Sequence, residues 1–111
     1  MRNIFILFFL VLNVLNLNAQ KVYSVNYASN SDIKVFVCKY ESMADLVVFK
    51  EKYESNARKN EGRWFFVDYE SMADKKIFFV KYASQADIIV YFTKYISKSG
   101  WKNREKIHLF Y

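Results

Sequence analysis

The chain has 111 residues, of which 53% are hydrophobic, 20% aromatic and 25% charged, with a formal net charge of +6 at pH 7. This length fits one domain, and the many aromatic residues exclude an intrinsically disordered chain. A single cysteine excludes a disulfide scaffold, and two glycines without any proline exclude collagen-like and proline-rich architectures.

The N-terminus has the segment order of a secretory signal peptide. Residues 1–3 form a short basic start, residues 4–12 are apolar, and Ala19 is a small residue suited to a cleavage site. A membrane-spanning helix needs about 20 apolar residues, and this run is shorter and is followed by scattered asparagines. We expect residues 1–19 to be a signal peptide and residues 20–111 to form one periplasmic or secreted domain without a membrane span. An uncleaved anchor is the alternative.

A repeat runs through the mature chain. Six tyrosines are each followed by a serine two residues later, at spacings of 13, 13, 16, 13 and 13 residues. The pairs are Tyr27 and Ser29, Tyr40 and Ser42, Tyr53 and Ser55, Tyr69 and Ser71, Tyr82 and Ser84, and Tyr95 and Ser97. Four units add an aspartate (Asp32, Asp45, Asp74 and Asp87), and Arg58 and Gly100 take its place in the other two.

The units form a second, longer repeat. Corresponding tyrosines lie 42 residues apart, so the chain consists of two halves of three units each. Each half ends in a Gly-Trp element, Gly62-Arg63-Trp64 in the first and Gly100-Trp101 in the second. Such an internal duplication predicts two pseudo-symmetric halves within one domain.

Short apolar runs rich in Val, Ile and Phe connect the units, over residues 35–38, 46–49, 65–67, 77–80 and 88–92. This composition is typical of strands, and the apolar character of both alternating faces predicts burial on both sides. Between the runs, Ser-x-Ala-Asp resembles a capping box, which predicts one helical turn. We expect strand and helical turn to alternate six times, with residues 107–111 as a last strand, in an α+β fold.

The units also resemble those of a known family. Tyr-Glu-Ser-Met-Ala-Asp at residues 40–45 and 69–74, and the tail over residues 99–108, are similar to the septoil-knot domain family, a domain of unknown function. The resemblance covers about residues 21–111. It implies a compact fold whose backbone forms a seven-crossing torus knot, with the two halves wound around each other. It implies no activity, cofactor or catalytic residue.

The repeated side chains each have two interpretations. We expect the serines and aspartates to form caps and turns, and the alternative is a series of calcium ligands. We expect the tyrosines to pack in the core or at its boundary, and the alternative is a stacking surface for carbohydrate or bases. Lysines precede four of the tyrosines (Lys39, Lys52, Lys81 and Lys94), which suggests that their aliphatic stems cover the rings.

Cys38 and His108 are the two side chains with the most reactive chemistry. Cys38 lies in an apolar run, which favours a small buried side chain over an intermolecular disulfide or a nucleophile, both of which need an exposed thiol. His108 is the only histidine. It has neither a zinc-ligand pair nor a nucleophile elbow in the sequence, so we expect no catalytic residue, metal or cofactor.

Charge carries the one functional hint. A C-terminal group consists of Lys98, Lys102, Arg104 and Lys106, and a group in the first half consists of Arg58, Lys59 and Arg63. Clustered cations attract phosphate and acidic polymers, which predicts a binding surface. The alternative is that these side chains form a solvated face that only supports solubility. If a pseudo-two-fold axis relates the halves, the two groups are equivalent surfaces.

We therefore expect a non-enzymatic exported monomer. Its partner is a protein or an anionic envelope polymer bound through the C-terminal basic face; we do not expect nucleic acid, which an exported protein seldom meets. A passive structural or protease-resistant protein is the first alternative. A small hydrolase using His108, or a protease inhibitor using the insertion at residues 56–62, is the second.

Overall fold

A computed structural model describes residues 20–56 and 60–111. Seven short strands alternate with 3-10 turns, and no α-helix occurs in these two segments. The strands are β1 (Lys21–Ser24), β2 (Ile33–Val37), β3 (Leu46–Lys50), β4 (Arg63–Phe66), β5 (Lys75–Phe79), β6 (Ile88–Thr93) and β7 (Gly100–Trp101). The 3-10 elements are η1 (Ala28–Asn30), η2 (Glu41–Met43), η3 (Glu54–Asn56), η4 (Glu70–Met72), η5 (Ala83–Gln85), η6 (Ile96–Lys98) and η7 (Arg104–Phe110). The expected alternation of strands and single helical turns is thus present.

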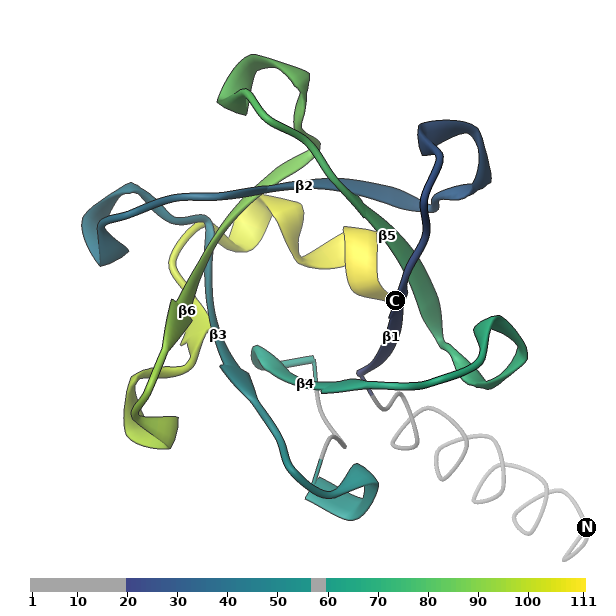
Figure 1. Ribbon diagram of the computed structural model, residues 1–111. Helices are drawn as coiled ribbons and strands as arrows, with labels where there is room; N and C mark the ends of the chain where they lie inside the picture. The colour runs from purple at the N-terminus through teal and green to yellow at the C-terminus, as the bar shows by residue number, and fades with distance from the viewer. Residues whose placement is uncertain (1–19, 57–59) are drawn as a thin grey trace, which may run out of the picture.

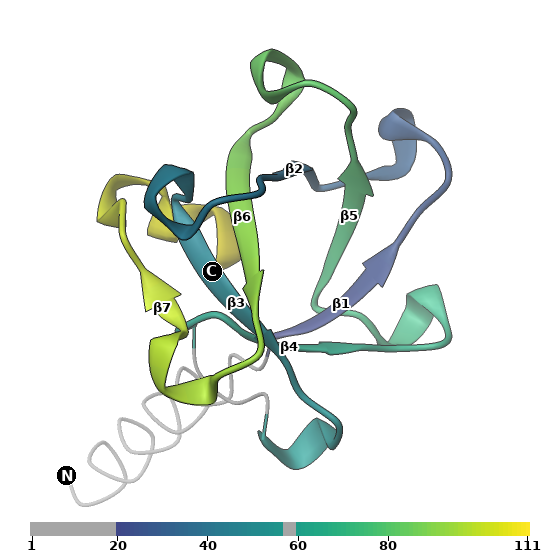
Figure 2. The ribbon, with the colours of Figure 1, turned by 60° about the vertical axis from the view of Figure 1, so that its left-hand side comes forward.

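Six parallel strands form a closed barrel. Their order is β4-β1-β5-β2-β6-β3, and a further pairing of β3 with β4 closes the ring (Figure 1). β7 adds to β3 as a short antiparallel strand (Figure 2). Closure removes the free edges on which parallel sheets would otherwise associate.

The two halves of the sequence alternate around this barrel. Every one of the six parallel ladders joins a strand of the first half (β1, β2, β3) to a strand of the second (β4, β5, β6). Strands that correspond in sequence are neighbours in the ring, as β1 and β4, β2 and β5, and β3 and β6. Moving each strand of the first half by one position around the barrel therefore places it on its counterpart in the second half. A pseudo-two-fold axis would instead place counterparts on opposite sides of the barrel, so the prediction of such an axis is wrong.

The ladder registers arrange the inward side chains in layers. Counted from each unit's tyrosine, neighbouring strands are displaced by two residues at every step around the ring. Equivalent positions of the six units therefore lie at one level along the barrel axis. The middle layer is Val22, Val35, Val48, Trp64, Ile77 and Val90, and all six side chains are completely buried.

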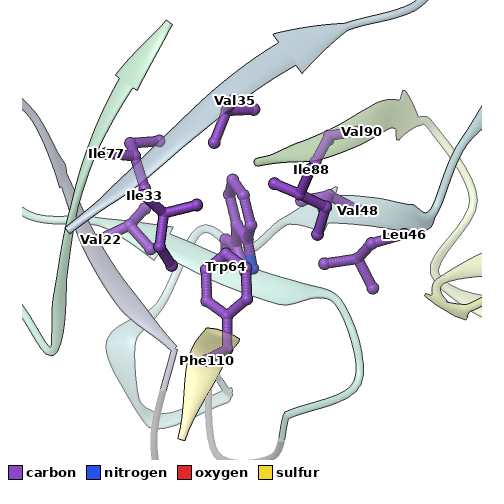
Figure 3. Close-up of a cluster of buried hydrophobic side chains, with 10 residues drawn as sticks. All are labelled: Val22, Ile33, Val35, Leu46, Val48, Trp64, Ile77, Ile88, Val90 and Phe110. Atoms are coloured by element: carbon purple, nitrogen blue, oxygen red, sulfur yellow. The ribbon is translucent and has the colours of Figure 1, made fainter. Parts of the chain in front are cut away.

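Trp64 fills the centre of this core (Figure 3). Its ring centroid lies 5.2 Å from that of Phe110, and 6.2 and 6.1 Å from those of Phe66 and Phe92. At the end of β3, the ammonium of Lys50 lies 4.5 Å above the Phe92 ring centroid. One tryptophan thus supplies bulk where five smaller side chains meet, because a small barrel must be filled to high density.

The C-terminal segment forms helix η7 across the barrel (Figure 1), so the expected strand at residues 107–111 is wrong. The Asn103 side chain caps the helix by accepting a hydrogen bond from the Glu105 amide. This turn brings Phe110 into the core, where 2% of it is exposed. The apolar residues of the tail thus anchor the helix to the core through the buried Phe110, and Leu109 packs against the same core.

In five of the turns the unit serine is not the cap, contrary to the capping-box prediction. The N-cap of η1, η2, η4, η5 and η6 is the unit tyrosine, in extended conformation and without a side-chain cap hydrogen bond. In η2, for example, two backbone bonds close the turn: Met43 N donates to Tyr40 O and Ala44 N donates to Glu41 O, both at 3.1 Å. Ser42 occupies the middle of the turn and is exposed.

The repeated aspartates join the two halves. The Asp45 amide donates to the Ile89 carbonyl at 2.7 Å, and the Asp45 carboxylate accepts from the Ile89 amide at 2.8 Å. The same two-bond clamp links Asp32 to Lys76, Asp74 to Lys21 and Asp87 to Lys34. Each aspartate immediately precedes a strand, and it binds the backbone of the neighbouring strand from the other half. The sequence pattern did not reveal this structural role.

The clamps give the first testable expectation. Asp45→Ala should lower the free energy of unfolding by about 2–3 kcal/mol, because a partly buried charge-assisted bond is lost. Asp32→Ala should cost about 1 kcal/mol, since its clamp is exposed to water. Urea unfolding of both variants measures this. If Asp45→Ala costs no more than Ser42→Ala, an exposed change in the same unit, the clamp does not stabilise the fold.

Candidate functional site

The turns project from the barrel as six arms, and each carries its unit tyrosine (Figure 1). The exposed fractions are 68% for Tyr27, 67% for Tyr40, 68% for Tyr53, 68% for Tyr69, 65% for Tyr82 and 62% for Tyr95. The prediction that these rings pack in the core or at its boundary is wrong. Alternating strand residues already fill the barrel, so the rings have no room inside and lie in solvent.

The lysines that precede four of these tyrosines are also exposed (Lys39, Lys52, Lys81 and Lys94). Each exposed lysine is thus the chain neighbour of an exposed ring. The sequence shows this pairing, but the order of the residues alone does not show that both side chains face solvent. One feature of the sequence points to this exposure. The apolar runs alone supply enough inward-facing residues to fill the interior of a six-stranded barrel, which leaves no room for the tyrosines.

Of the C-terminal basic group, Lys98 and Arg104 are the members whose side chains make no hydrogen bond or ion pair among the described residues. Lys98 is exposed, and its ammonium lies 5.6 Å from the Tyr95 ring centroid. Arg104 is exposed at the start of η7. The two together present positive charge on the segment that follows β6.

The other two members of that group are engaged. Lys102 lies 3.8 Å from a carboxylate oxygen of Glu41. Lys106 donates to the Asp87 carbonyl at 2.7 Å. Both lysines therefore help to attach the C-terminal segment to the barrel, close to the first residues of β3 and β6.

Backbone and side-chain bonds hold this segment firmly. The amides of Lys102 and Asn103 donate to the Asp45 carbonyl at 2.8 and 2.9 Å. The Trp101 indole donates to the Asn60 carbonyl at 2.9 Å, and the Asn60 side chain donates to the Ile107 carbonyl at 2.9 Å. The basic side chains of residues 98–106 therefore stand on a fixed backbone.

Of the first-half basic group, Arg63 is the member that lies within the described residues. Arg63 Nε lies 2.5 Å from Glu51 Oε2, and the Glu51 side chain is 4% exposed, so this charge is balanced in place. Arg58 and Lys59 lie outside the described residues. So do residues 57–59 of the insertion considered as an inhibitor loop, in which Asn60 and Gly62 are buried.

Cys38 is buried at 6% exposure beside Ala44 and Val47, as expected for a small apolar side chain. Its thiol donates to the Tyr40 carbonyl at 3.2 Å. Burial raises the pKa of the Cys38 thiol, and the negative charge of Asp45 raises it further. Both effects oppose the thiolate that a nucleophile would need.

This environment predicts slow alkylation of Cys38. Iodoacetamide should modify the native thiol at pH 8 at least about tenfold more slowly than in urea-unfolded protein, because access and thiolate formation both require opening. The raised pKa also means that the folded state holds the proton more tightly, so stability should fall as pH rises above about 8.5. Cys38→Ala should remove that part of the fall. Equal labelling rates for native and unfolded protein would contradict the burial.

His108 is exposed on η7, and its Nδ1 lies 3.0 Å from the Glu105 carbonyl oxygen one turn earlier. Within the described residues, no group of three His, Cys, Asp or Glu side chains is placed to hold a metal ion. An open hollow of about 290 Å³ outside the barrel is lined by Ala28, Lys34, Phe78, Val80 and Gln85. Lys34 is its one titratable side chain, so the hollow has no acid–base pair.

The expected signal peptide lies in residues 1–19, outside the described part of the chain. In the part described, no helix combines the length and apolar character needed to cross a bilayer.

No curated protein and no solved structure matches the chain significantly. The 7(1) septoil knot domain matches residues 19–102, a span that includes all seven strands and ends before η7. The chain therefore belongs to the septoil knot domain family.

Proposed function

We propose that this protein is a non-enzymatic exported module that binds an anionic polymer of the cell envelope. The observation that carries the proposal is the C-terminal basic face, defined as Lys98, Lys102, Arg104 and Lys106. Its two exposed and unpaired members, Lys98 and Arg104, stand on a backbone segment that is bonded to the barrel on both sides. Because the backbone of this segment is already ordered, an anion that binds has to immobilise only the side chains of these cations. The entropy cost of binding is therefore small.

An NMR titration of residues 20–111 tests this function. Oligogalacturonate, anionic lipid headgroups and short DNA are added in turn at low and moderate salt, and backbone amide shifts are followed. We expect oligogalacturonate to shift amides of residues 98–106 at both salt concentrations. Shifts that vanish at moderate salt would show only general charge attraction. The absence of shifts with every probe would contradict anion binding and leave a protein partner or a passive structural role.

We further propose that the backbone is threaded as the seven-crossing torus knot implied by the family. The alternation of the two halves around the barrel supports this, because a chain that winds twice must pass between its own earlier strands. Such threading should show itself as slow unfolding. Stopped-flow unfolding at several urea concentrations measures the rate, and rapid unfolding in low urea with easy protease digestion would contradict the proposal.

A further inference from the structure

We infer that the outer rim of the barrel binds an acidic polysaccharide through four adjacent arms that each present a lysine beside a tyrosine. We call this surface the Lys–Tyr arc. It consists of Lys81 and Tyr82, Lys39 and Tyr40, Lys94 and Tyr95, and Lys52 and Tyr53. The inference rests on the proposed binding of an anionic envelope polymer, and it names a second, larger surface and the chemistry that the surface recognises.

The first argument is the retention of an exposed ring in every unit. The aspartate clamp is absent from the units of Tyr53 and Tyr95, although it stabilises the fold elsewhere. The tyrosine persists in all six units, although each of these residues is at least 62% exposed. Exposed large aromatic side chains contribute little to a core, so stability does not explain their repetition. Exposed aromatic rings are typical of binding surfaces.

The second argument is the order of the arms. Around the barrel the strands follow as β1, β5, β2, β6, β3 and β4, so the turns after them follow as η1, η5, η2, η6, η3 and η4. The four arms with a lysine before the tyrosine are η5, η2, η6 and η3, which are consecutive (Figure 1). In the other two arms, η1 and η4, the tyrosine follows Asn26 and Asp68. In sequence these four units are second, third, fifth and sixth, so only the fold brings them together.

The third argument is continuity with the basic C-terminal face. Lys98 ends η6, Lys102 lies beside Glu41 of η2, and Lys106 lies beside Asp87, which follows η5. The three turns η6, η2 and η5 all belong to the Lys–Tyr arc. The C-terminal basic face therefore lies on the same side of the barrel as the Lys–Tyr arc, so one long anion that follows the arc also reaches the unpaired Lys98.

The chemistry of the pairs identifies the occupant. A tyrosine with most of its surface exposed can stack against a flat apolar face, and the exposed lysine that precedes it in the chain adds a positive charge to the same arm. A polymer of acidic sugars repeats both features along its length. Nucleic acid would also supply rings and charges, but bidentate phosphate recognition is usually the work of arginine, and all four pairs contain lysine. Several weak pairs that engage one polymer would combine by avidity.

The experiment compares two matched double variants. Tyr40→Ala/Tyr95→Ala removes rings from adjacent arms of the Lys–Tyr arc, η2 and η6. Tyr27→Ala/Tyr69→Ala removes rings from the adjacent arms η1 and η4, which lie outside the arc and are exposed to the same extent. Both variants lose the same side chains from equivalent backbone positions, so their folding is affected alike. A third variant, Lys98→Gln/Arg104→Gln, removes the two free charges of the C-terminal face.

Calorimetric titration with oligogalacturonate measures the affinity of each protein. We expect Tyr40→Ala/Tyr95→Ala to weaken binding by about tenfold or more, which corresponds to the loss of about one good stacking contact. Tyr27→Ala/Tyr69→Ala should change the affinity by about twofold at most, within the range of context effects on a remote surface. Lys39→Gln/Lys94→Gln should lower the slope of log affinity against log salt by about one per lysine.

Other results would overturn the inference in distinguishable ways. If both tyrosine variants bind like the natural chain while Lys98→Gln/Arg104→Gln loses binding, the Lys–Tyr arc is wrong and the proposed function stands. If the natural chain does not bind oligogalacturonate, both fail. Equal affinity for polyglutamate, which has charge without rings, would exclude stacking. Tighter binding of oligo-dT than of oligogalacturonate would exclude polysaccharide as the preferred occupant.

Discussion

Gly62→Ala should prevent folding or lower the free energy of unfolding by at least about 4 kcal/mol. Gly62 is buried with φ +81°, and a Cβ there would lie 2.3 Å from the backbone oxygen of Val47. That oxygen cannot move away easily, because the Phe49 amide of the same strand donates to the Gly62 carbonyl at 2.7 Å. Far-ultraviolet circular dichroism and urea unfolding of the purified variant measure the loss.

Gly100→Ala is the matched control for this prediction. Gly100 also has positive φ, +144°, but a Cβ there would meet no atom within 4 Å. Only backbone strain remains, so the expected cost is about 1–3 kcal/mol. The difference between the variants isolates the contact with β3. Similar losses in the two variants would mean that β3 and β4 separate easily, against the closed barrel.

Trp64→Ala should lower the free energy of unfolding by about 3–5 kcal/mol. The side chain is completely buried in the middle layer, and it contacts Phe66, Phe92 and Phe110. Truncation leaves a cavity that the closed ring of strands cannot collapse to fill. Chemical unfolding followed by circular dichroism measures the change. A loss near 1 kcal/mol would show that Trp64 is not the centre of the core.

Trp64→Phe separates ring packing from hydrogen bonding. Among the described residues, the buried Trp64 Nε1 has no hydrogen-bond partner, and an unsatisfied buried donor costs about 1–3 kcal/mol. Phenylalanine keeps most of the ring and removes the donor. We expect a loss of only about 1–2 kcal/mol, because relief of the unsatisfied donor offsets part of the lost packing. A loss as large as that of Trp64→Ala would indicate that the Nε1 position is stabilising.

Local structure was predictable from the sequence because it depends on short-range pattern. Short runs such as residues 46–49 and 88–92 became β3 and β6, and single helical turns lie between them. The family was also predictable, since the spacing of the tyrosines is unusual. The parallel barrel and the order of its strands were not, because pairing partners lie up to 53 residues apart and both halves have the same pattern.

The roles of the repeated residues were the least predictable part. Ser42 and Asp45 match a capping box, yet a three-residue 3-10 turn is closed by its own backbone, and the carboxylate reaches Ile89 of another strand. The repeat pattern predicts that Tyr40 packs in the core or at its boundary, because a tyrosine ring offers a large apolar surface and its hydroxyl can reach a partner at the rim. Only the closed geometry of the barrel shows that its interior is already full and that this ring faces water.

The alternation of halves has a consequence for biosynthesis. All six barrel ladders join a first-half strand to a second-half strand, so residues 21–50 have no barrel partner among themselves. A chain that emerges N-terminus first must wait for β4 before the first of these ladders can form, and for β6 before the barrel can close. The nascent first half therefore has no barrel ladder of its own until β4 emerges. For a protein that crosses a membrane unfolded, this delay would keep the chain competent for translocation until its last strands arrive.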